Sequence, residues 1–160
     1  MLQKRLAEGF EALGIRSGDT LLVHSSLKSL EGASPADVIE ALLALLGPEG
    51  TLMFPTLSYL HSNRNNPVFD VRRTPSNVGA IPEYFRTEYP ALRSLCPTHS
   101  CAAVGLRAEY LTGAHHLDDT PCGPNSPFRR LRDAGGKVLF IGCGTRPNTS
   151  MHAVEELSRP

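Results

Sequence analysis

Short apolar runs alternate with helical patterns along this chain, and this alternation limits the fold more than any other feature of the sequence. Residues 20–23 and 51–54 are brief, partly β-branched runs that are typical of buried parallel strands. Between them, Ser34 and Pro35 have the form of a helix start, and apolar residues at helical spacing continue until Gly47 and Pro48. The pattern favours an α/β fold with a mainly parallel or mixed sheet and helices on both faces.

The rest of the chain continues this pattern, with a long polar interruption after the second expected strand. Residues 56–77 are rich in Asn, Arg and Pro and form a loop of about 20 residues, a length that usually carries function. Further helices are expected at residues 2–13, 78–87, 127–135 and 149–157, and further strands at 100–105 and 137–142.

The end of the sequence suggests that the sheet is larger than the chain. The fourth expected strand is followed by a helix, and the sequence stops at Pro160 before a further strand that this helix could cover. A mainly parallel sheet of four strands is small. We therefore expect residues 1–160 to form one domain that lacks its C-terminal part.

Composition and charge exclude several classes of function. The 16 basic and 16 acidic side chains cancel and are scattered, so no basic stripe indicates nucleic-acid binding. No apolar run approaches the roughly 20 residues of a membrane span, and the charged start is unlike a signal peptide, so we expect a cytoplasmic protein. The four cysteines lack the C-x-x-C spacing of zinc modules, which predicts reduced thiols and no metal site.

Two residues of the last expected helix have the spacing of a general base and its partner. His152 and Glu155 are three positions apart, so they share one helix face. A carboxylate in that position can orient the imidazole, favour one tautomer and raise its basicity. Glu156 could do the same, and the alternative to catalysis is a surface ion pair.

A second candidate site follows the first expected strand. His24, Ser25 and Ser26 lie where that strand ends, and small hydroxyl residues at such a place can bring hydroxyls and backbone N–H groups towards a phosphate. Serine is also common at helix caps, so the sequence leaves phosphate binding and helix capping open.

Three other motifs carry weaker signals. Cys96 stands near His99, yet Pro97 between them indicates a turn and no group is seen to activate the thiol. Residues 115–119 contain two histidines and two aspartates, but neighbours in sequence diverge in space, so a solvated loop is expected. Residues 142–144 lack the third glycine of a dinucleotide fingerprint.

Five segments in order resemble the aminoglycoside 3-N-acetyltransferase family. They are GDTLLVHSSL at residues 18–27, GPEGTLMFPT at 47–56, RSLCPTHS at 93–100, CGPNSPF at 122–128 and NTSMHAVE at 148–155. They extend over nearly the whole chain, which makes the resemblance specific. The chain departs from the family's usual His-Pro at Cys96 and Pro97, and family members are longer.

The resemblance implies transfer of an acetyl group from acetyl-coenzyme A to the 3-amino group of a 2-deoxystreptamine antibiotic, with no metal. It makes His152 the catalytic histidine and Glu155 its carboxylate partner, in a Thr-x-x-His-x-x-Glu motif that starts at Thr149. It also implies a coenzyme site, which is lined by His24, Ser25, Ser26, Leu27, Lys28, Ser29, Pro97 and Thr98.

The acceptor site and the activity of the chain leave alternatives open. A polycationic drug needs polar and acidic partners, for which Tyr59 and Asp70 of the long loop are the candidates. Because no activated nucleophile is evident, the amine is expected to attack the thioester directly. The alternatives are an inactive shortened chain, or an acetyl-coenzyme A-dependent enzyme that acts on another small-molecule amine.

Overall fold

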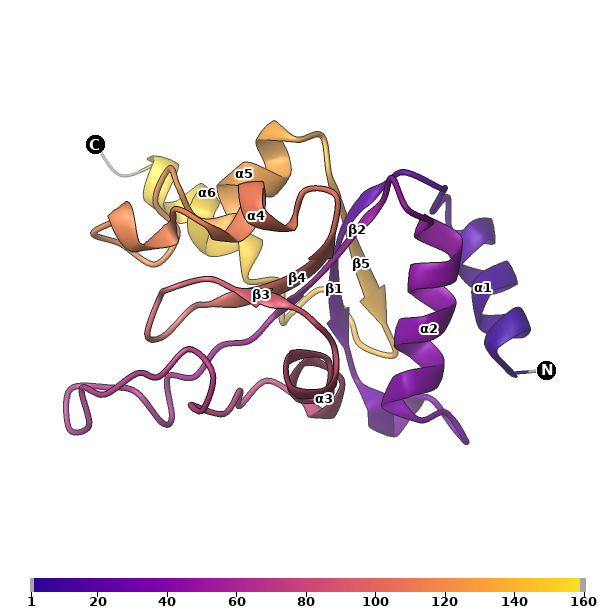
Figure 1. The fold of residues 1–160 in the computed structure, drawn as a ribbon, viewed down its shortest axis with the longest axis horizontal. Helices are drawn as coiled ribbons and strands as arrows, with labels where there is room; N and C mark the ends of the chain where they lie inside the picture. Colours follow the sequence, from indigo (N-terminus) through magenta and orange to yellow (C-terminus); the bar gives the residue numbers. More distant parts are fainter. Residues whose placement is uncertain (1, 159–160) are drawn as a thin grey trace.

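The computed structural model describes residues 2–158 as a sheet that lies between two layers of helices (Figure 1). The strands are β1 (Thr20–Ser25), β2 (Thr51–Pro55), β3 (Leu92–Arg93), β4 (Cys101–Gly105) and β5 (Lys137–Ile141). The α-helices are α1 (Leu2–Ala12), α2 (Pro35–Leu46), α3 (Ala80–Glu88), α4 (Ala108–Thr112), α5 (Pro127–Asp133) and α6 (Ser150–Ser158), and two 3₁₀ helices are η1 (Leu27–Ser29) and η2 (His115–Leu117).

The sheet is mixed, with the strand order β3-β4-β2-β1-β5. Strand β1 pairs in parallel with both β2 and β5, whereas β4 runs antiparallel to β2 and β3. The predicted α/β class with a mainly parallel or mixed sheet is therefore confirmed in its mixed form. The short elements β3 and α4 were not predicted, because two and five residues are too few to display a hydrophobic period.

Alternation along the strands builds a separate core on each face of the sheet. Leu21 and Val23 of β1 pack into one core with α1, α2 and α3, while Leu22 between them packs into the other with α4, α5 and α6. Figure 1 shows these two groups of helices on opposite sides of the strands. Because successive side chains of a strand point to opposite faces, a continuous apolar run is what a strand covered on both faces requires.

Helix α2 begins and ends at the predicted residues. The Ser34 hydroxyl accepts a hydrogen bond from the Asp37 amide at 3.2 Å, and the Asp37 carboxylate accepts one from the Ser34 amide at 3.0 Å. This reciprocal capping box satisfies two backbone donors that the first helical turn leaves unpaired. At the other end, Gly47 has a φ of 65°, a conformation that ends the helix at low steric cost.

Within residues 2–158, no helix has both the length and the apolar character that crossing a membrane would require.

Candidate active site

The predicted pair on α6 is formed in the structure. His152 Nδ1 lies 3.0 Å from Glu155 Oε2. A carboxylate only accepts hydrogen bonds, so Nδ1 carries the proton and Nε2 keeps its lone pair in the neutral ring. That tautomer is the one a general base needs, with Nε2 as the basic atom.

The pair opens into a hollow of about 520 Å³. Tyr59 from the long loop lies in its wall together with His152 and Glu155, so the structure brings the predicted acceptor residue and the predicted base together. His99 is also in this wall, and its ring meets that of His152 edge to face, with 5.9 Å between centroids and 88° between planes. His99 was not among the predicted site residues, because residues 99 and 152 meet only in the folded chain.

A second hollow, of about 500 Å³, lies at the turn after β1. Four predicted coenzyme residues, Ser25 to Lys28, line it together with Gly79 and Ala80 at the start of α3. Val78 lines the hollow of the His152–Glu155 pair and the next residue, Gly79, lines this one, so one peptide bond separates lining residues of the two hollows. The first turn of α3 leaves backbone N–H groups unpaired, which suits an anionic ligand.

His24 and Ser29 belong to the same predicted coenzyme segment, but they do not line this hollow. The His24 ring is buried and stacks on Phe140, with centroids 5.3 Å apart and planes inclined by 12°. Burial lowers the pKa of His24 to about 4, so the ring is neutral near pH 7. Ser29 donates a hydrogen bond from its hydroxyl to the Ser26 hydroxyl at 3.3 Å. Neither lines the hollow at the turn, so the structure does not place these two residues with the other four predicted coenzyme residues of the segment.

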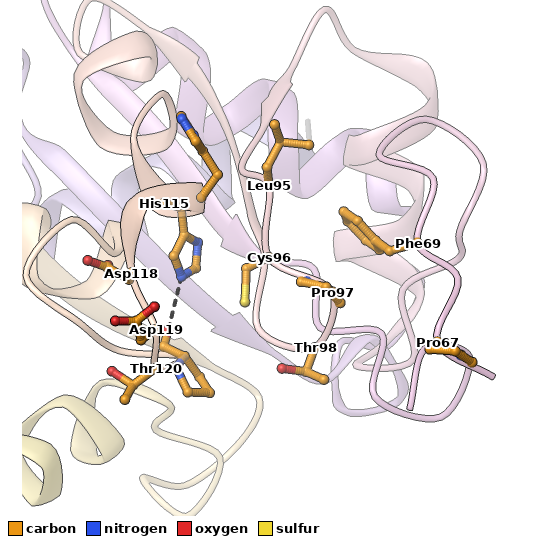
Figure 2. A pocket seen from close by; sticks show the side chains of 12 residues that line it. Pro67, Phe69, Leu95, Cys96, Pro97, Thr98, His115, Asp118, Asp119 and Thr120 are labelled. Atoms are coloured by element: carbon orange, nitrogen blue, oxygen red, sulfur yellow. Dashed lines mark hydrogen bonds between the residues drawn. The ribbon is translucent and has the colours of Figure 1, made fainter. Parts of the chain in front are cut away.

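The structure does not bring Pro97 and Thr98 into the hollow that Ser25 to Lys28 line. They line a third hollow, of about 590 Å³, beside Cys96 and Asp119 (Figure 2). Thr98 nevertheless contacts a residue of the hollow of the His152–Glu155 pair, because its hydroxyl lies 2.9 Å from His99 Nδ1.

The prediction of a solvated loop at residues 115–119 is wrong for its first member. His115 is buried, with Nδ1 2.9 Å from the Ser94 hydroxyl and Nε2 3.0 Å from the Pro121 carbonyl oxygen. The carbonyl can only accept, so Nε2 carries the proton and His115 cross-links the strand region to the loop that contains Pro121. Nothing in the local sequence pattern marks this residue as buried.

Cys96 differs from the other three cysteines. Burial raises its pKa, but the neighbouring His115 and the amides of His99 and Thr98 outweigh burial, and the pKa of Cys96 is lowered. Burial raises the pKa of the remaining thiols, to about 12 for Cys122. Among residues 2–158, no group of three His, Cys, Asp or Glu side chains is arranged to hold a metal ion.

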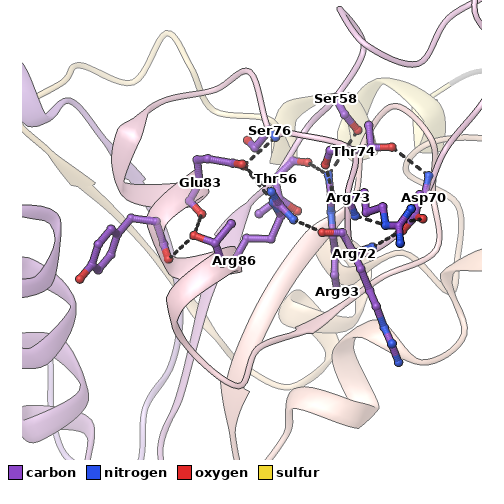
Figure 3. A network of polar contacts seen from close by, with 12 residues as sticks. Thr56, Ser58, Asp70, Arg72, Arg73, Thr74, Ser76, Glu83, Arg86 and Arg93 are labelled. Atoms are coloured by element: carbon purple, nitrogen blue, oxygen red, sulfur yellow. Dashed lines mark hydrogen bonds and ion pairs between the residues drawn. The ribbon is translucent and has the colours of Figure 1, made fainter.

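The long loop between β2 and α3 is held in place by Arg93 of β3 (Figure 3). Its guanidinium donates to the carbonyl oxygens of Thr56 at 2.9 Å and Thr74 at 2.6 Å, near the two ends of the loop. It also lies over the Phe69 ring, 5.0 Å from the centroid. Burial lowers the pKa of Arg93 to about 10, which still leaves it charged near neutral pH.

Asp70 forms hydrogen bonds within the loop in which it lies. Its Oδ1 accepts hydrogen bonds from the amides of Arg72 at 2.8 Å and Arg73 at 3.0 Å, and these bonds, that of Arg72 first, lower its pKa. It is not among the residues that line the hollow with Tyr59 and His152. The structure therefore brings Tyr59, but not Asp70, to the predicted base.

Comparison with known proteins gives one consistent result. A family model described as aminoglycoside 3-N-acetyltransferase matches residues 22–160. Aminoglycoside N(3)-acetyltransferase VII of Streptomyces paromomycinus is 34% identical, over 96% of this chain and 60% of the relative. The chain thus spans about 60% of the length of the curated relatives it matches.

Two solved structures are similar in fold and in sequence. AAC-IIIb in a binary complex with CoASH has a TM-score of 0.86 and 31% identity, over 98% of this chain and 65% of that one. A mutant of aminoglycoside acetyltransferase AAC(3)-IVa in complex with a gentamicin has a TM-score of 0.88 and 33% identity, over 98% and 60%. The family match covers most of the residues, including both the turn after β1 and the pair on α6, and the chain belongs to the aminoglycoside 3-N-acetyltransferase family.

Proposed function

We propose that this chain transfers an acetyl group from acetyl-coenzyme A to the 3-amino group of a 2-deoxystreptamine aminoglycoside. The observation that carries the proposal is that neighbouring residues, Val78 and Gly79, line the hollow of the His152–Glu155 pair and the hollow at the turn after β1. A thioester held in the second hollow can present its carbonyl carbon to an amine held in the first.

His152 acts as the general base in this proposal. An aliphatic amine is mostly protonated near pH 7, so a proton must leave the nitrogen before it attacks the thioester. His152 Nε2 takes that proton, and Glu155 stabilises the imidazolium that results. The nitrogen then forms a bond to the acetyl carbon and the carbon–sulfur bond breaks. The leaving thiolate takes the proton that His152 returns, and the extra proton on the new amide nitrogen passes to solvent.

The coenzyme is assigned to the turn after β1. The hydroxyls and backbone of Ser25 and Ser26, the ammonium of Lys28 and the N-terminal amides of α3 together form an environment that suits phosphate oxygens. Ser25 Oγ is buried and has no hydrogen-bond partner among the described residues, which leaves it available to a ligand. The similar AAC-IIIb structure contains CoASH, which agrees with this assignment.

The acceptor is assigned to the catalytic hollow, with Tyr59 in its wall. Asp70 is not assigned to the acceptor, because its carboxylate accepts hydrogen bonds from the amides of Arg72 and Arg73 and does not line this hollow. Similar structures of the family contain gentamicin or apramycin, both of which are aminoglycosides. A polycationic acceptor also suits a wall that includes the Glu155 carboxylate.

The experiment that tests the function measures coenzyme A release from acetyl-coenzyme A by the chain and by His152→Ala, with gentamicin as acceptor. We expect His152→Ala to lower kcat by about a hundredfold or more, because a general base acts in the transition state. The dissociation constant of acetyl-coenzyme A, measured by calorimetry, should change by less than about twofold, because His152 belongs to the other hollow.

The same assay separates the alternatives. Turnover with spermidine but not with gentamicin would assign another amine as acceptor. Binding of acetyl-coenzyme A without turnover of any amine would assign an inactive chain. An activity of His152→Ala within about tenfold of the parent would remove His152 from the role of base.

A further inference from the structure

The catalytic pair is too exposed to hold its own geometry. The side chains of His152 and Glu155 keep 56% and 64% of their exposure, and one hydrogen bond joins them. An ion pair of this kind three residues apart on a helix surface contributes little, because water competes for it and both side chains lose rotamer freedom. A base must nevertheless point at the reacting amine within a narrow range of angles. Another contact therefore has to fix the His152 ring.

His99 makes that contact from a different part of the fold. Its ring meets the His152 ring edge to face at 5.9 Å, the arrangement that aromatic rings prefer over a face-to-face stack. The two histidines also share the walls of two hollows, the catalytic one and a smaller one of about 290 Å³. His99 lies just before β4, so the contact joins α6 to the sheet.

His99 is itself firmly held. Its Nδ1 lies 2.9 Å from the Thr98 hydroxyl, and its amide donates to Cys96 Sγ at 3.4 Å. The Thr98 carbonyl accepts a hydrogen bond from the Ser58 amide at 3.1 Å, which ties the turn to the start of the long loop. Figure 2 shows Cys96 and Thr98 on this turn. A ring anchored in this way can orient a mobile neighbour.

We propose that His99 is a positioning residue that fixes the ring of His152 so that Nε2 faces the acceptor amine. The proposal rests on the proposed function, since it concerns the same base. His99 does not touch the reacting atoms in this account, and it acts only through His152.

The charge of His99 is compatible with this role. Burial lowers its pKa, the nearby rings of His152 and His115 lower it further, and Glu156 opposes them. His99 therefore stays neutral when His152 takes up the proton of the amine, and two adjacent imidazolium ions are avoided.

The test compares His99→Ala, which removes the ring, with His99→Phe, which keeps an aromatic ring but no nitrogen. His61→Ala is the matched control, because His61 is an exposed histidine of the long loop. The first measurement is the NMR signal of the His152 Cε1 proton. We expect the ring current of residue 99 to displace this signal in the parent, in His99→Phe and in the control, and we expect the displacement to disappear in His99→Ala.

The second measurement is turnover with gentamicin. We expect His99→Ala to lower kcat by about tenfold or more, while KM for acetyl-coenzyme A changes by less than about twofold, because a misplaced base slows the chemical step and not binding. His99→Phe should recover most of the lost kcat. A residue that only stabilises the fold would not lower kcat while leaving KM unchanged, and phenylalanine at position 99 would not restore kcat.

The two measurements distinguish an error in the proposed function from an error in the role of His99. If the parent has no acetyltransferase activity, the proposed function is wrong, but the NMR signal still decides whether His99 fixes His152. An unchanged His152 signal in His99→Ala, or a His99→Phe enzyme no better than His99→Ala, overturns the proposal. Should His99→Ala unfold, His99→Leu replaces it, because leucine keeps the bulk without an aromatic ring.

Discussion

Strand β2 with helix α2, and strand β5 with the helix α6 that follows it in the chain, are packed very differently. All five residues of β2 are buried, whereas Lys137 of β5 is exposed and Val138 and Phe140 are half-buried. Five residues of α2 are buried, whereas α6 buries Ala153 and leaves Met151, Val154 and Leu157 about half-exposed. The hollow that we propose for the coenzyme thus follows the buried strand β1, and the proposed base stands on a helix that buries one residue.

This difference explains why the base needs support from outside its helix. Strand β5 lies at the edge of the sheet, and among residues 2–158 it pairs with β1 alone. An element with few buried apolar contacts opens at a lower free energy than the core does. Three kinds of contact join α6 to the better packed side of the molecule: Ala153 packs into the core, Glu156 accepts hydrogen bonds from Thr120 and Cys122, and His152 meets the ring of His99.

The largest expected effect is on stability, and it tests the packing difference directly. Leu42→Ala in α2 should lower the free energy of unfolding by about 2–5 kcal/mol, because a fully buried leucine leaves a cavity. Leu157→Ala in α6 makes the same chemical change at a half-exposed position and should change the free energy of unfolding by no more than about 0.5 kcal/mol. Urea unfolding of both variants measures the difference. Equal losses would show that α6 is as well packed as α2.

The second effect concerns the long loop, which Arg93 holds by several hydrogen bonds. Arg93→Lys should release the loop, because lysine cannot reproduce the fork of donors that reaches Thr56, Val71 and Thr74. Loss of these part-buried hydrogen bonds costs about 1–3 kcal/mol. Limited trypsin digestion measures the result, since the loop contains Arg64, Arg72 and Arg73.

We expect cleavage within the loop to be several times faster in Arg93→Lys than in the parent. Arg132→Lys is the control, because Arg132 pairs with Asp133 at the surface and should leave the cleavage rate unchanged. An unchanged digestion pattern in Arg93→Lys would mean that other contacts hold the loop.

The third effect concerns the turn after β1. Replacing Ser25 and Ser26 together by valine should weaken acetyl-coenzyme A binding by about tenfold, because the change removes two hydroxyls from a phosphate site and adds bulk to its wall. Calorimetry measures the affinity, and the melting temperature checks that the variant is folded. If a folded double variant keeps its affinity, the two serines serve the turn and not the coenzyme.

The elements with local signals could be predicted from the sequence, and the contacts between distant residues could not. The bounds of α2 followed from Ser34 and Gly47, because capping depends on residues close in sequence. The hydrogen bond between His152 and Glu155 followed from helical spacing. The contact of His99 with His152 and the burial of His115 depend on how the turn before β4 meets α6 and the 115–121 loop, which no local period encodes.

The smallest expected effect is a pH dependence at the β5 margin. Lys137 at the start of β5 forms an ion pair of 2.6 Å with Asp19, the residue that precedes β1. Partial burial raises the pKa of Asp19, but the hydrogen bond from Lys137 and the amide of Arg16 outweigh it, so the pKa is lowered from 3.8. A lowered carboxyl pKa contributes stability that is complete above the unfolded value and is lost as the pH falls through the folded value.

Asp19→Asn should therefore destabilise the chain by no more than about 1 kcal/mol near pH 7, because the pair is partly exposed. The difference in free energy of unfolding between Asp19→Asn and the parent should shrink as the pH falls below 3.8, because protonation of Asp19 removes the same charge from the parent. Hydrogen exchange of the β5 amides at pH 7 should rise more than that of the β2 amides, since β5 opens locally and β2 opens only when the core unfolds. Equal increases in both strands would mean that the margin and the centre of the sheet unfold as one unit.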